Sequence, residues 1–320
     1  MTPSVIPSHS PDEVTALPSR PLVYRSSRGI GSHFYYPGKA RKNMNIYTLN
    51  VGQGQLVAIT GKNEAIVVDT FLPLNAQNQD TEHVIGALAD IFQGKNFVGA
   101  IITGFDDDHF CDVGVKTVLN KYRPDWVMYP RYYKDSNAAR ACFKTIEAFL
   151  DEKELRKISV DLADPNNSRV YDDISKDFSF EVFSPHKRDM NSSNNCSIVC
   201  KVTERSTGAT YLITGDTEIP RWDSILRLFK TRLKADVMAA PHHGSKNGIT
   251  KAVLEAVSPD TVLISAGVSS QYGHPHDEAI ELYHASARAT CRTNKGTGQS
   301  ILTVANGSEV KNSVWTRAKK

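Results

Sequence analysis

Val98-Gly99-Ala100-Ile101-Ile102-Thr103-Gly104-Phe105-Asp106-Asp107-Asp108-His109 joins an apolar run directly to three acidic residues and a histidine. The apolar run predicts a short buried strand, and the residues from Asp112 onward have helical spacing, so Asp106–His109 occupies a loop at a strand end. Asp and His are ligands for divalent metals, and the Asp-x-Asp-His spacing lets several donors converge from one turn. Acidic residues before a helix are also common caps that complement its dipole. The loop alone leaves metal binding and capping open.

Histidine is concentrated in the same kind of position elsewhere in the chain. Five of the ten histidines fall in three short segments, each after a predicted apolar strand: His109, the pair His242 and His243, and His274 with His276. A loop at a strand end can aim side chains from several segments into one place. We therefore expect a common site, with a polar surface loop as the alternative reading of each segment taken alone.

A fourth strand end carries a carboxylate, and the loop with His242 and His243 carries further polar groups. Asp216 ends the apolar run Leu212-Ile213-Thr214-Gly215, where an aspartate either makes a turn or binds a metal. In Pro241-His242-His243-Gly244-Ser245-Lys246, adjacent imidazoles offer a metal ligand beside a loop whose backbone amides, Ser245 hydroxyl and Lys246 ammonium suit a phosphate. The sequence thus places candidate metal ligands next to candidate phosphate-binding groups.

The chain divides into a terminal arm and one α/β domain. Residues 1–43 are rich in Pro and Ser, lack hydrophobic periodicity and carry six basic against two acidic side chains, which predicts a basic mobile arm. From residue 44 to the end at 320, strands and helices follow one another without a linker. The predicted strands are 44–51, 55–60, 65–69, 98–103, 126–129, 178–183, 197–202, 210–214, 236–240, 261–265 and two flanking Asn306-Gly307, and the predicted helices are 81–93, 112–122, 138–155, 219–233 and 250–257.

Composition excludes several classes of protein. With 40% apolar and 23% charged residues over 320 positions, the chain is neither disordered nor fibrous. No run approaches the roughly 20 apolar residues of a membrane span, and no signal-peptide core follows a basic start, so we expect a cytoplasmic protein without a membrane partner. Its five scattered cysteines form no Cys-x-x-Cys pair and are expected to be reduced. The net charge of +3 belongs to the arm, because the remainder carries 32 basic and 33 acidic side chains.

The order and identity of the motifs resemble the metallo-β-lactamase superfamily, and within it the ComEC-like branch of competence proteins and related soluble hydrolases. The resemblance spans about residues 45 to 280 and is carried by Asn50-Val51-Gly52-Gln53-Gly54-Gln55, Ile66-Val67-Val68-Asp69-Thr70, Thr103 to His109, Asn194-Asn195-Cys196-Ser197-Ile198-Val199, Leu212 to Asp216, Pro241 to Lys246, and Tyr272-Gly273-His274-Pro275-His276. It implies a four-layer αββα sandwich with a metal site at one edge of the two sheets. It also implies phosphodiester hydrolysis as the leading activity.

This chain departs from the family pattern at one metal position. The family's metal loop usually begins with histidine, whereas Gly104 stands first here and Asp106 second. Six candidate donors remain: Asp106, Asp108, His109, Asp216, His242 and His274. A site richer in carboxylate oxygen shifts the expected preference from Zn²⁺ towards Mn²⁺ or Mg²⁺, although the imidazoles keep Zn²⁺ a candidate. One or two ions both remain open.

The resulting hypothesis is a metal-dependent hydrolase, a phosphodiesterase or nuclease that cuts DNA or RNA through a metal-activated water. Asp108, Asp216 and His276 are the expected catalytic residues. His243, Ser245 and Lys246 are expected to bind substrate, and His274 and His276 are left undivided between metal binding and protonation of the leaving oxygen.

Two other functions remain as alternatives. One is hydrolysis of a small ester, lactam or cyclic nucleotide by the same fold, and the other is a degenerate, non-catalytic nucleic-acid-binding module. Nucleic acid is favoured as the partner by the basic arm and by the mixture of aromatic and basic residues over 122–134, which suits base stacking and phosphate contact. The competing interpretation of 122–134 is a buried strand followed by a surface turn.

Overall fold

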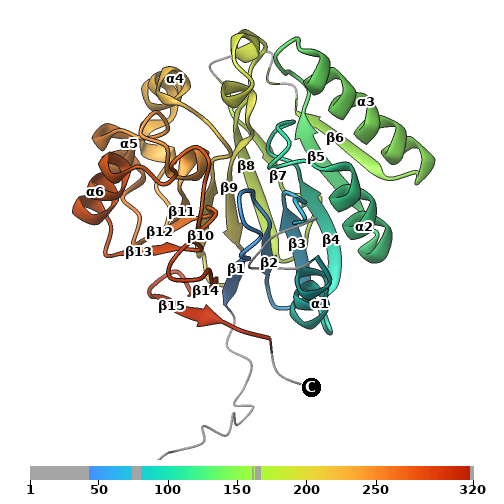
Figure 1. The fold of residues 1–320 in the computed structure, drawn as a ribbon, viewed down its shortest axis with the longest axis horizontal. Helices are drawn as coiled ribbons and strands as arrows, with labels where there is room; N and C mark the ends of the chain where they lie inside the picture. The colour runs from blue at the N-terminus through green and yellow to red at the C-terminus, as the bar shows by residue number, and fades with distance from the viewer. Residues whose placement is uncertain (1–42, 74–80, 161, 163–166, 318–320) are drawn as a thin grey trace, which may run out of the picture. The chain divides into compact units, whose positions relative to one another are not determined.

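Two β-sheets pack face to face in the described part of the chain, and helices cover the outer face of each (Figure 1). The structure is a computed structural model that describes residues 43–73, 81–160, 162 and 167–317. The first sheet has the strand order β15 (Val310–Trp315), β14 (Ser300–Ala305), β1 (Met44–Thr48), β2 (Val57–Thr60), β3 (Glu64–Val68), β4 (Asn96–Ile101), β5 (Trp126–Pro130) and β6 (Arg156–Val160). The second has the order β13 (Ala289–Arg292), β12 (Thr261–Ile264), β11 (Val237–Ala239), β10 (Thr210–Ile213), β9 (Val199–Glu204), β8 (Phe178–Ser184) and β7 (Arg169–Tyr171).

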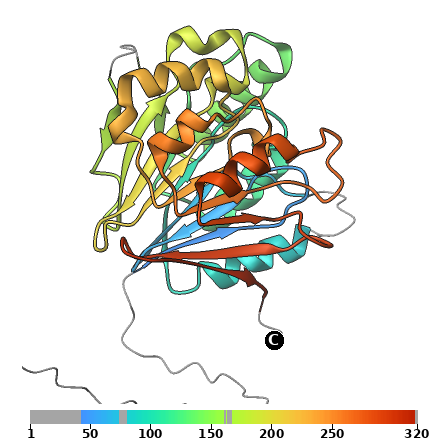
Figure 2. The same ribbon diagram turned by 90° about the vertical axis from the view of Figure 1, so that its left-hand side faces the viewer.

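The helices divide between the two sheets. The first sheet is covered by α1 (Thr81–Ile91), α2 (Asp112–Tyr122) and α3 (Asn137–Glu152), and the second by α4 (Ile219–Phe229), α5 (Lys251–Val257) and α6 (Asp277–Ser286). Figure 2 shows α4, α5 and α6, drawn in orange and red, lying together on one side of the strands. The predicted four-layer αββα sandwich is confirmed.

Three buried apolar clusters hold these layers together. The cluster between the sheets joins side chains of both, such as Ile46 and Met128 from the first and Phe180 and Tyr211 from the second. A second cluster lies between the first sheet and α1–α3, and a third between the second sheet and α4–α6, around Trp222. Each fully buried side chain of this kind stabilises the fold by about 1.5–3 kcal/mol. The strand ends that carry the polar loops are therefore rigidly held.

The direction of the strands brings five loops to one edge of the sandwich. Strands β3, β4, β5 and β6 are parallel in the first sheet, and β10, β11, β12 and β13 are parallel in the second. In α/β sheets, ligands bind beyond the carboxyl ends of parallel strands. The segments after β3, β4, β10, β11 and β12 carry Asp69, Asp106–His109, Asp216, the pair His242-His243 and His274, respectively.

Most predicted elements are present, with small differences at their ends. The predicted helix 138–155 is wrong in its last turn, because α3 ends at Glu152 and Arg156–Val160 form strand β6. Glu154 has φ 54°, a left-handed conformation that ends the helix and redirects the chain. The hydrophobic pattern of the sequence likewise does not predict β7, α6 or β13.

The sequence also predicts the state of the cysteines, the absence of a membrane span and a mobile N-terminal arm. All five cysteines are free thiols, as expected. No helix within the described residues has both the length and the apolar character needed to cross a membrane. The predicted mobile arm, residues 1–43, lies outside the described residues except for Asn43 and stays a prediction.

Candidate metal centre

Four side chains from three loops converge at the edge of the sandwich. Asp108, His109, Asp216 and His243 each offer one ligand atom, and these atoms all lie within 4.8 Å of one another. Nε2 of His109 is 2.9 Å from Oδ1 of Asp216 and 4.0 Å from Oδ1 of Asp108. Nε2 of His243 is 3.3 Å from Oδ2 of Asp108 and 3.6 Å from Oδ1 of Asp216. Carboxylate oxygens and imidazole nitrogens therefore alternate around a common point.

The donor atoms at this point lack hydrogen-bond partners. Nε2 of His109, Oδ1 of Asp216 and Nε2 of His243 are buried, and none meets the geometry of a hydrogen bond within the described part of the chain, although Nε2 of His109 and Oδ1 of Asp216 are at ion-pair distance when the ring is protonated. Buried polar atoms are nearly always paired, so three orphans facing one another need an explanation. Ligand atoms bound to one ion at about 2.1 Å lie roughly 3 to 4 Å apart, which matches these separations. The four residues thus fit one divalent metal ion.

Asp69 fixes the orientation of His109 from behind. Nδ1 of His109 donates to Oδ2 of Asp69 at 2.8 Å, which turns Nε2, the other ring nitrogen, toward the donor cluster. The Asp69 carboxylate also accepts the Thr103 backbone N–H and hydroxyl, both at 2.7 Å, and the Gln55 amide at 2.9 Å. Asp69 is fully buried, so this set of hydrogen bonds is shielded from water.

His243 is oriented in the same manner by the backbone. Its Nδ1 donates to the carbonyl oxygen of Ser265 at 2.8 Å and presents Nε2 to Asp108 and Asp216. His242 and His243 have φ values of 49° and 53°, and non-glycine residues rarely adopt this left-handed conformation. Such strain is retained where the surrounding structure enforces it, commonly at functional sites.

Charge coupling within the cluster shifts its pKa values. Burial disfavours the charged imidazole of His109, but the carboxylates of Asp216 and Asp69 outweigh it and raise its pKa well above the usual range. Burial likewise opposes ionisation of Asp216, but His109 and His243 hold its pKa well below the usual range. In the metal-free protein the positive charge of the protonated His109 ring balances the negative charge of the Asp69 and Asp216 carboxylates. A divalent cation takes over that role when it binds and displaces the proton.

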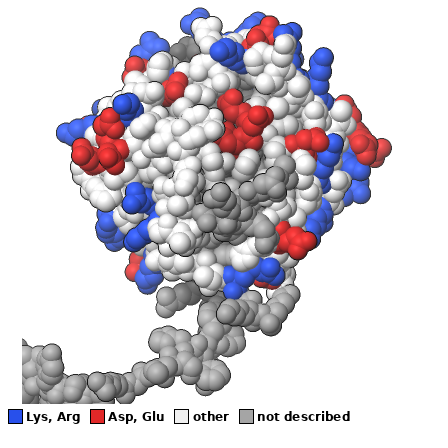
Figure 3. All heavy atoms as spheres, viewed as in Figure 1, with Lys and Arg blue, Asp and Glu red and all other residues white. Residues whose placement is uncertain are grey.

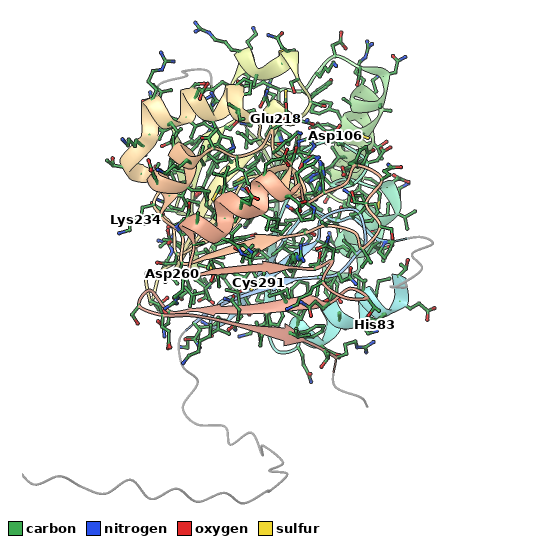
Figure 4. The ribbon with its side chains drawn as sticks, turned by 60° about the vertical axis from the view of Figure 1, so that its left-hand side comes forward. His83, Asp106, Glu218, Lys234, Asp260 and Cys291 are labelled. Carbon is green, nitrogen blue, oxygen red and sulfur yellow. The ribbon has the colours of Figure 1, made fainter. Side chains whose placement is uncertain are left out.

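A cavity of about 550 Å³ opens beside the cluster and is lined by Asp108, Asp216 and His243. A second group of possible metal ligands lines the same cavity. Oδ and ring atoms of Asp106, His242 and His274 face it, and burial together with the charges of Asp216 and Asp108 raises the pKa of Asp106. Burial and the neighbouring imidazoles lower the pKa of His274 to about 4, so this ring is neutral and able to bind a metal. Figure 4 shows Asp106 and Glu218 at the same end of the sandwich.

The pair His242 and Glu218 lies beside this second group. Nδ1 of His242 is 3.4 Å from Oε1 of Glu218, which also accepts a hydrogen bond from the Asn194 amide at 3.1 Å. The rings of His242 and His274 meet edge to face, with centroids 5.1 Å apart. The full lining of the cavity is Gln53, Phe71, Asp106, Asp107, Asp108, Asn194, Asp216, His242, His243, Gln271, Tyr272 and His274.

Four of the residues expected at the site lie outside this lining: His109, which belongs to the donor cluster, and Ser245, Lys246 and His276, which do not. The Ser245 side chain is buried, and its hydroxyl accepts the Asn247 backbone N–H at 3.3 Å. The Lys246 ammonium pairs with Glu278 at 3.1 Å, and Nδ1 of His276 accepts the Lys246 backbone N–H at 3.2 Å. His243, expected to bind substrate, joins the four-residue cluster, whereas His242 lies beside it.

Several residues that the structure brings to the site carry no distinguishing signal in the sequence. Asp69 and Asn194 stand within quoted motifs, but nothing in either motif distinguishes a ligand from a residue that orients one. Gln53 and Tyr272 also belong to quoted motifs and line the cavity. Glu218 gave no signal in the sequence, because it follows a turn and precedes a helix as many surface acids do.

A family model described as the metallo-beta-lactamase superfamily matches residues 49–268, more than half of the chain and the whole of the site just described except Gln271, Tyr272 and His274. The chain belongs to the metallo-β-lactamase superfamily. Its resemblance to the competence-protein branch is confirmed by curated relatives. This metallo-β-lactamase-superfamily chain is 33% identical over 120 residues to ComE operon protein 3 of Bacillus subtilis, and 32% identical over 102 residues to competence protein ComA of Neisseria gonorrhoeae.

These matches cover only part of each protein. They span 38% and 32% of this chain, and 15% and 14% of the respective relatives. Among solved structures, Igni18, a metallo hydrolase from Ignicoccus hospitalis, has 12% sequence identity and a TM-score of 0.48, covering 81% of this chain and 98% of its own. CmlA, a diiron β-hydroxylase from Streptomyces venezuelae, also has 12% identity and a TM-score of 0.48, covering 79% and 53%. The superfamily membership and the donor cluster together identify a metal-dependent hydrolase fold.

Proposed function

We propose that this protein is a metal-dependent phosphodiesterase that cleaves nucleic acid. The observation that carries the proposal is the cluster of Asp108, His109, Asp216 and His243, whose ligand atoms all lie within 4.8 Å of one another around three buried atoms that meet no hydrogen-bond geometry within the described residues. A divalent ion held there supplies Lewis acidity, which activates water and neutralises charge on phosphoryl oxygens.

A second ion is proposed at Asp106, His242 and His274. These residues line the cavity next to the first cluster, and Oε1 of Glu218 lies 3.4 Å from Nδ1 of His242. The mixture of three aspartates and four imidazoles is suited to Mn²⁺, with Zn²⁺ and Mg²⁺ as weaker candidates. We place no catalytic role on Ser245, Lys246 or His276, because none of them lines the cavity.

The charge of the cavity explains why a phosphodiester needs the metal. Its described lining contains four aspartates and neither Lys nor Arg. Acidic side chains also gather near the centre of the face seen in Figure 3, with Lys and Arg towards its margins. A phosphate anion is repelled by such a surface until cations occupy it. We therefore propose that substrate and metal bind together.

Neutral side chains at the mouth of the cavity are proposed to hold the rest of the substrate. The Gln53 amide lines the cavity, and neither of its terminal atoms, both buried, has a hydrogen-bond partner within the described residues, so it is free to bind a phosphate or base. Tyr272 is 57% exposed and lies with its ring centroid 5.9 Å from that of His274. An exposed aromatic ring beside the reacting groups offers a stacking surface to any base.

The names of the relatives support nucleic acid as the substrate class. ComE operon protein 3, competence protein ComA and Recombination protein 2 of Haemophilus influenzae are named for competence or recombination. Since this chain matches only 13 to 15% of their lengths, the assignment of DNA or RNA to this chain rests on the site as well. A cytoplasmic location stays a prediction from sequence.

Purified full-length protein tests the proposal directly. Single-stranded DNA, duplex DNA and RNA are incubated with the protein in EDTA and with Mn²⁺, Zn²⁺ or Mg²⁺ added back, and cleavage is expected only with metal. Asp108→Ala and Asp216→Ala should abolish cleavage, while Asp112→Ala should not, because Asp112 is an exposed helix residue paired with Lys116. Cleavage that persists in both cluster variants, prepared in parallel, contradicts the proposal.

The size of the cavity favours one alternative. A volume of about 550 Å³ lies within the range of sites that enclose small molecules. A small phosphodiester or cyclic nucleotide is therefore the second candidate substrate. Hydrolysis of bis(p-nitrophenyl) phosphate or a cyclic mononucleotide with no cleavage of polynucleotide would select it.

A further inference from the structure

A second cavity, of about 380 Å³, lies where the two sheets end in the strands β13 and β15. Its walls come from helix α6, strand β13, the turn that follows it, and strands β14 and β15. Cys291, one of its lining residues, lies well away from Asp106 and Glu218 in Figure 4. The lining consists of Ile280, His284, Thr290, Cys291, Arg292, Lys295, Gln299, Ile301, Asn312, Ser313 and Val314.

The charge of this cavity is opposite to that of the metal centre. Arg292, Lys295 and His284 line it, and its described lining contains no Asp or Glu. Neighbouring bases outside the cavity are paired: Lys311 lies 2.9 Å from Glu309, and Arg288 lies 3.6 Å from Asp260. Neither Arg292 nor Lys295 has a carboxylate partner within the described residues, so both cations are available to a ligand.

The remaining wall offers an apolar surface and a free hydroxyl. Ile280 and Ile301 contribute apolar side chains, and Val314 is 56% exposed. Oγ1 of Thr290 is buried and lacks a hydrogen-bond partner in the described part of the chain. Burial raises the pKa of the Cys291 thiol, which keeps it protonated and unreactive as part of the wall. A ligand with an anionic head and an apolar or planar body matches these groups.

We propose that this cavity binds a small organic phosphate of about mononucleotide size, independently of the metal centre. Arg292 and Lys295 bind the phosphate, because a guanidinium presents paired N–H donors and an ammonium adds a point charge. The apolar side chains of Ile280, Ile301 and Val314 pack against the body of the ligand. The volume of the cavity falls within the range of small-molecule sites.

Isothermal titration of the full-length protein in EDTA tests this site without metal at the other one. The probes are AMP, phenyl phosphate, inorganic phosphate and adenosine. AMP and phenyl phosphate are expected to bind more tightly than inorganic phosphate or adenosine, because only they offer both parts of the ligand. Arg292→Gln or Lys295→Gln should weaken binding of AMP at least about ten-fold, the effect of losing one charge-assisted hydrogen bond.

Matched variants distinguish AMP binding in this cavity from attraction by the net positive charge of the protein and from binding at the metal centre. Lys311→Gln removes the same charge from the adjacent strand β15 but outside the cavity, and it should leave AMP binding unchanged, as should Asp216→Ala. Val314→Glu places a carboxylate at an exposed position of the wall and should abolish binding without affecting folding. The proposal is overturned if neither AMP nor phenyl phosphate binds at millimolar concentration. It is also overturned if Lys311→Gln weakens binding as much as Arg292→Gln, or if Asp216→Ala abolishes it.

Discussion

Oδ2 of Asp69 lies 2.8 Å from Nδ1 of His109, on the side of the imidazole opposite to the donor cluster. The other ring nitrogen, Nε2, lies 2.9 Å from Asp216. The ring therefore connects a fully hydrogen-bonded buried carboxylate to the proposed metal position. Carboxylates in this position fix the tautomer of a metal-binding histidine and increase its basicity.

Asp69→Asn is expected to weaken Mn²⁺ binding by about 10- to 100-fold, because the neutral amide neither increases the basicity of His109 nor fixes its tautomer. Metal affinity is measured by isothermal titration of protein freed of metal. The matched control is Asp177→Asn, since Asp177 is a buried carboxylate that accepts the Asn63 and Glu64 backbone N–H groups far from the cluster. The control should lose stability but keep its Mn²⁺ affinity. Equal affinity in Asp69→Asn and wild type contradicts the role given to Asp69.

The raised pKa of His109 predicts opposite pH dependences for the metal-free and metal-bound protein. A histidine whose pKa is raised on folding stabilises the fold below its unfolded pKa, about 6.5, and this stabilisation is lost as the pH rises through the folded pKa. We therefore expect the Tm of the metal-free protein to fall as the pH increases above about 6.5. Mn²⁺ affinity should rise over the same interval, because the metal displaces the proton.

Calorimetry and titration across pH 6 to 9 check both trends. His109→Gln removes the titrating ring and should flatten the fall of Tm in the metal-free protein. A Tm that rises with pH in metal-free wild-type protein, or a fall of the same size in His109→Gln, contradicts this account.

How far the sequence predicts the site depends on what each residue contributes. Donors that directly follow apolar strands, such as Asp108, His109 and Asp216, could be found because strand and ligand are adjacent in the chain. The choice between His242 and His243 could not, since it depends on left-handed φ values at both residues and on a hydrogen bond to Ser265 in another loop. Sequence proximity does not encode which of two adjacent rings points into the cluster.

Burial along each element decides whether the sequence predicts it. Strand β5 was expected either to contact nucleic acid or to be buried, and Trp126 and Tyr129 are 1% exposed, so the second interpretation is correct for the strand. The hydrophobic pattern does not predict strand β6, because its first two residues, Arg156 and Lys157, are charged and exposed at the edge of the sheet. The α6 helix was missed because only Ala279 and Tyr283 are fully buried along it.

Gly104 offers a test of whether the missing histidine leaves a metal position weak. A Cβ built on Gly104 meets only Oγ of Ser197, at 3.8 Å, so the site has room for the start of a side chain. Gly104→His is expected to strengthen binding of a second Mn²⁺ ion, or to add one, because it supplies an imidazole beside Asp106. Elemental analysis after dialysis against limiting Mn²⁺ measures the change. Gly104→Leu fills the same space without a donor, and an equal metal content in the two variants contradicts the prediction.

Tyr272 separates a polynucleotide substrate from a small one. The ring is 57% exposed and belongs to none of the three buried apolar clusters, so Tyr272→Ala should change the free energy of unfolding by less than about 0.5 kcal/mol. If bases stack on it, KM for single-stranded DNA should rise about 5- to 150-fold, since stacking contributes roughly 1–3 kcal/mol per base. Cleavage of an abasic oligonucleotide, which has no base to stack on the ring, should keep its wild-type KM in Tyr272→Ala. Tyr272→Phe retains the ring and should restore the wild-type KM. A phenylalanine variant as weak as the alanine variant would place the effect on the hydroxyl instead and contradict stacking.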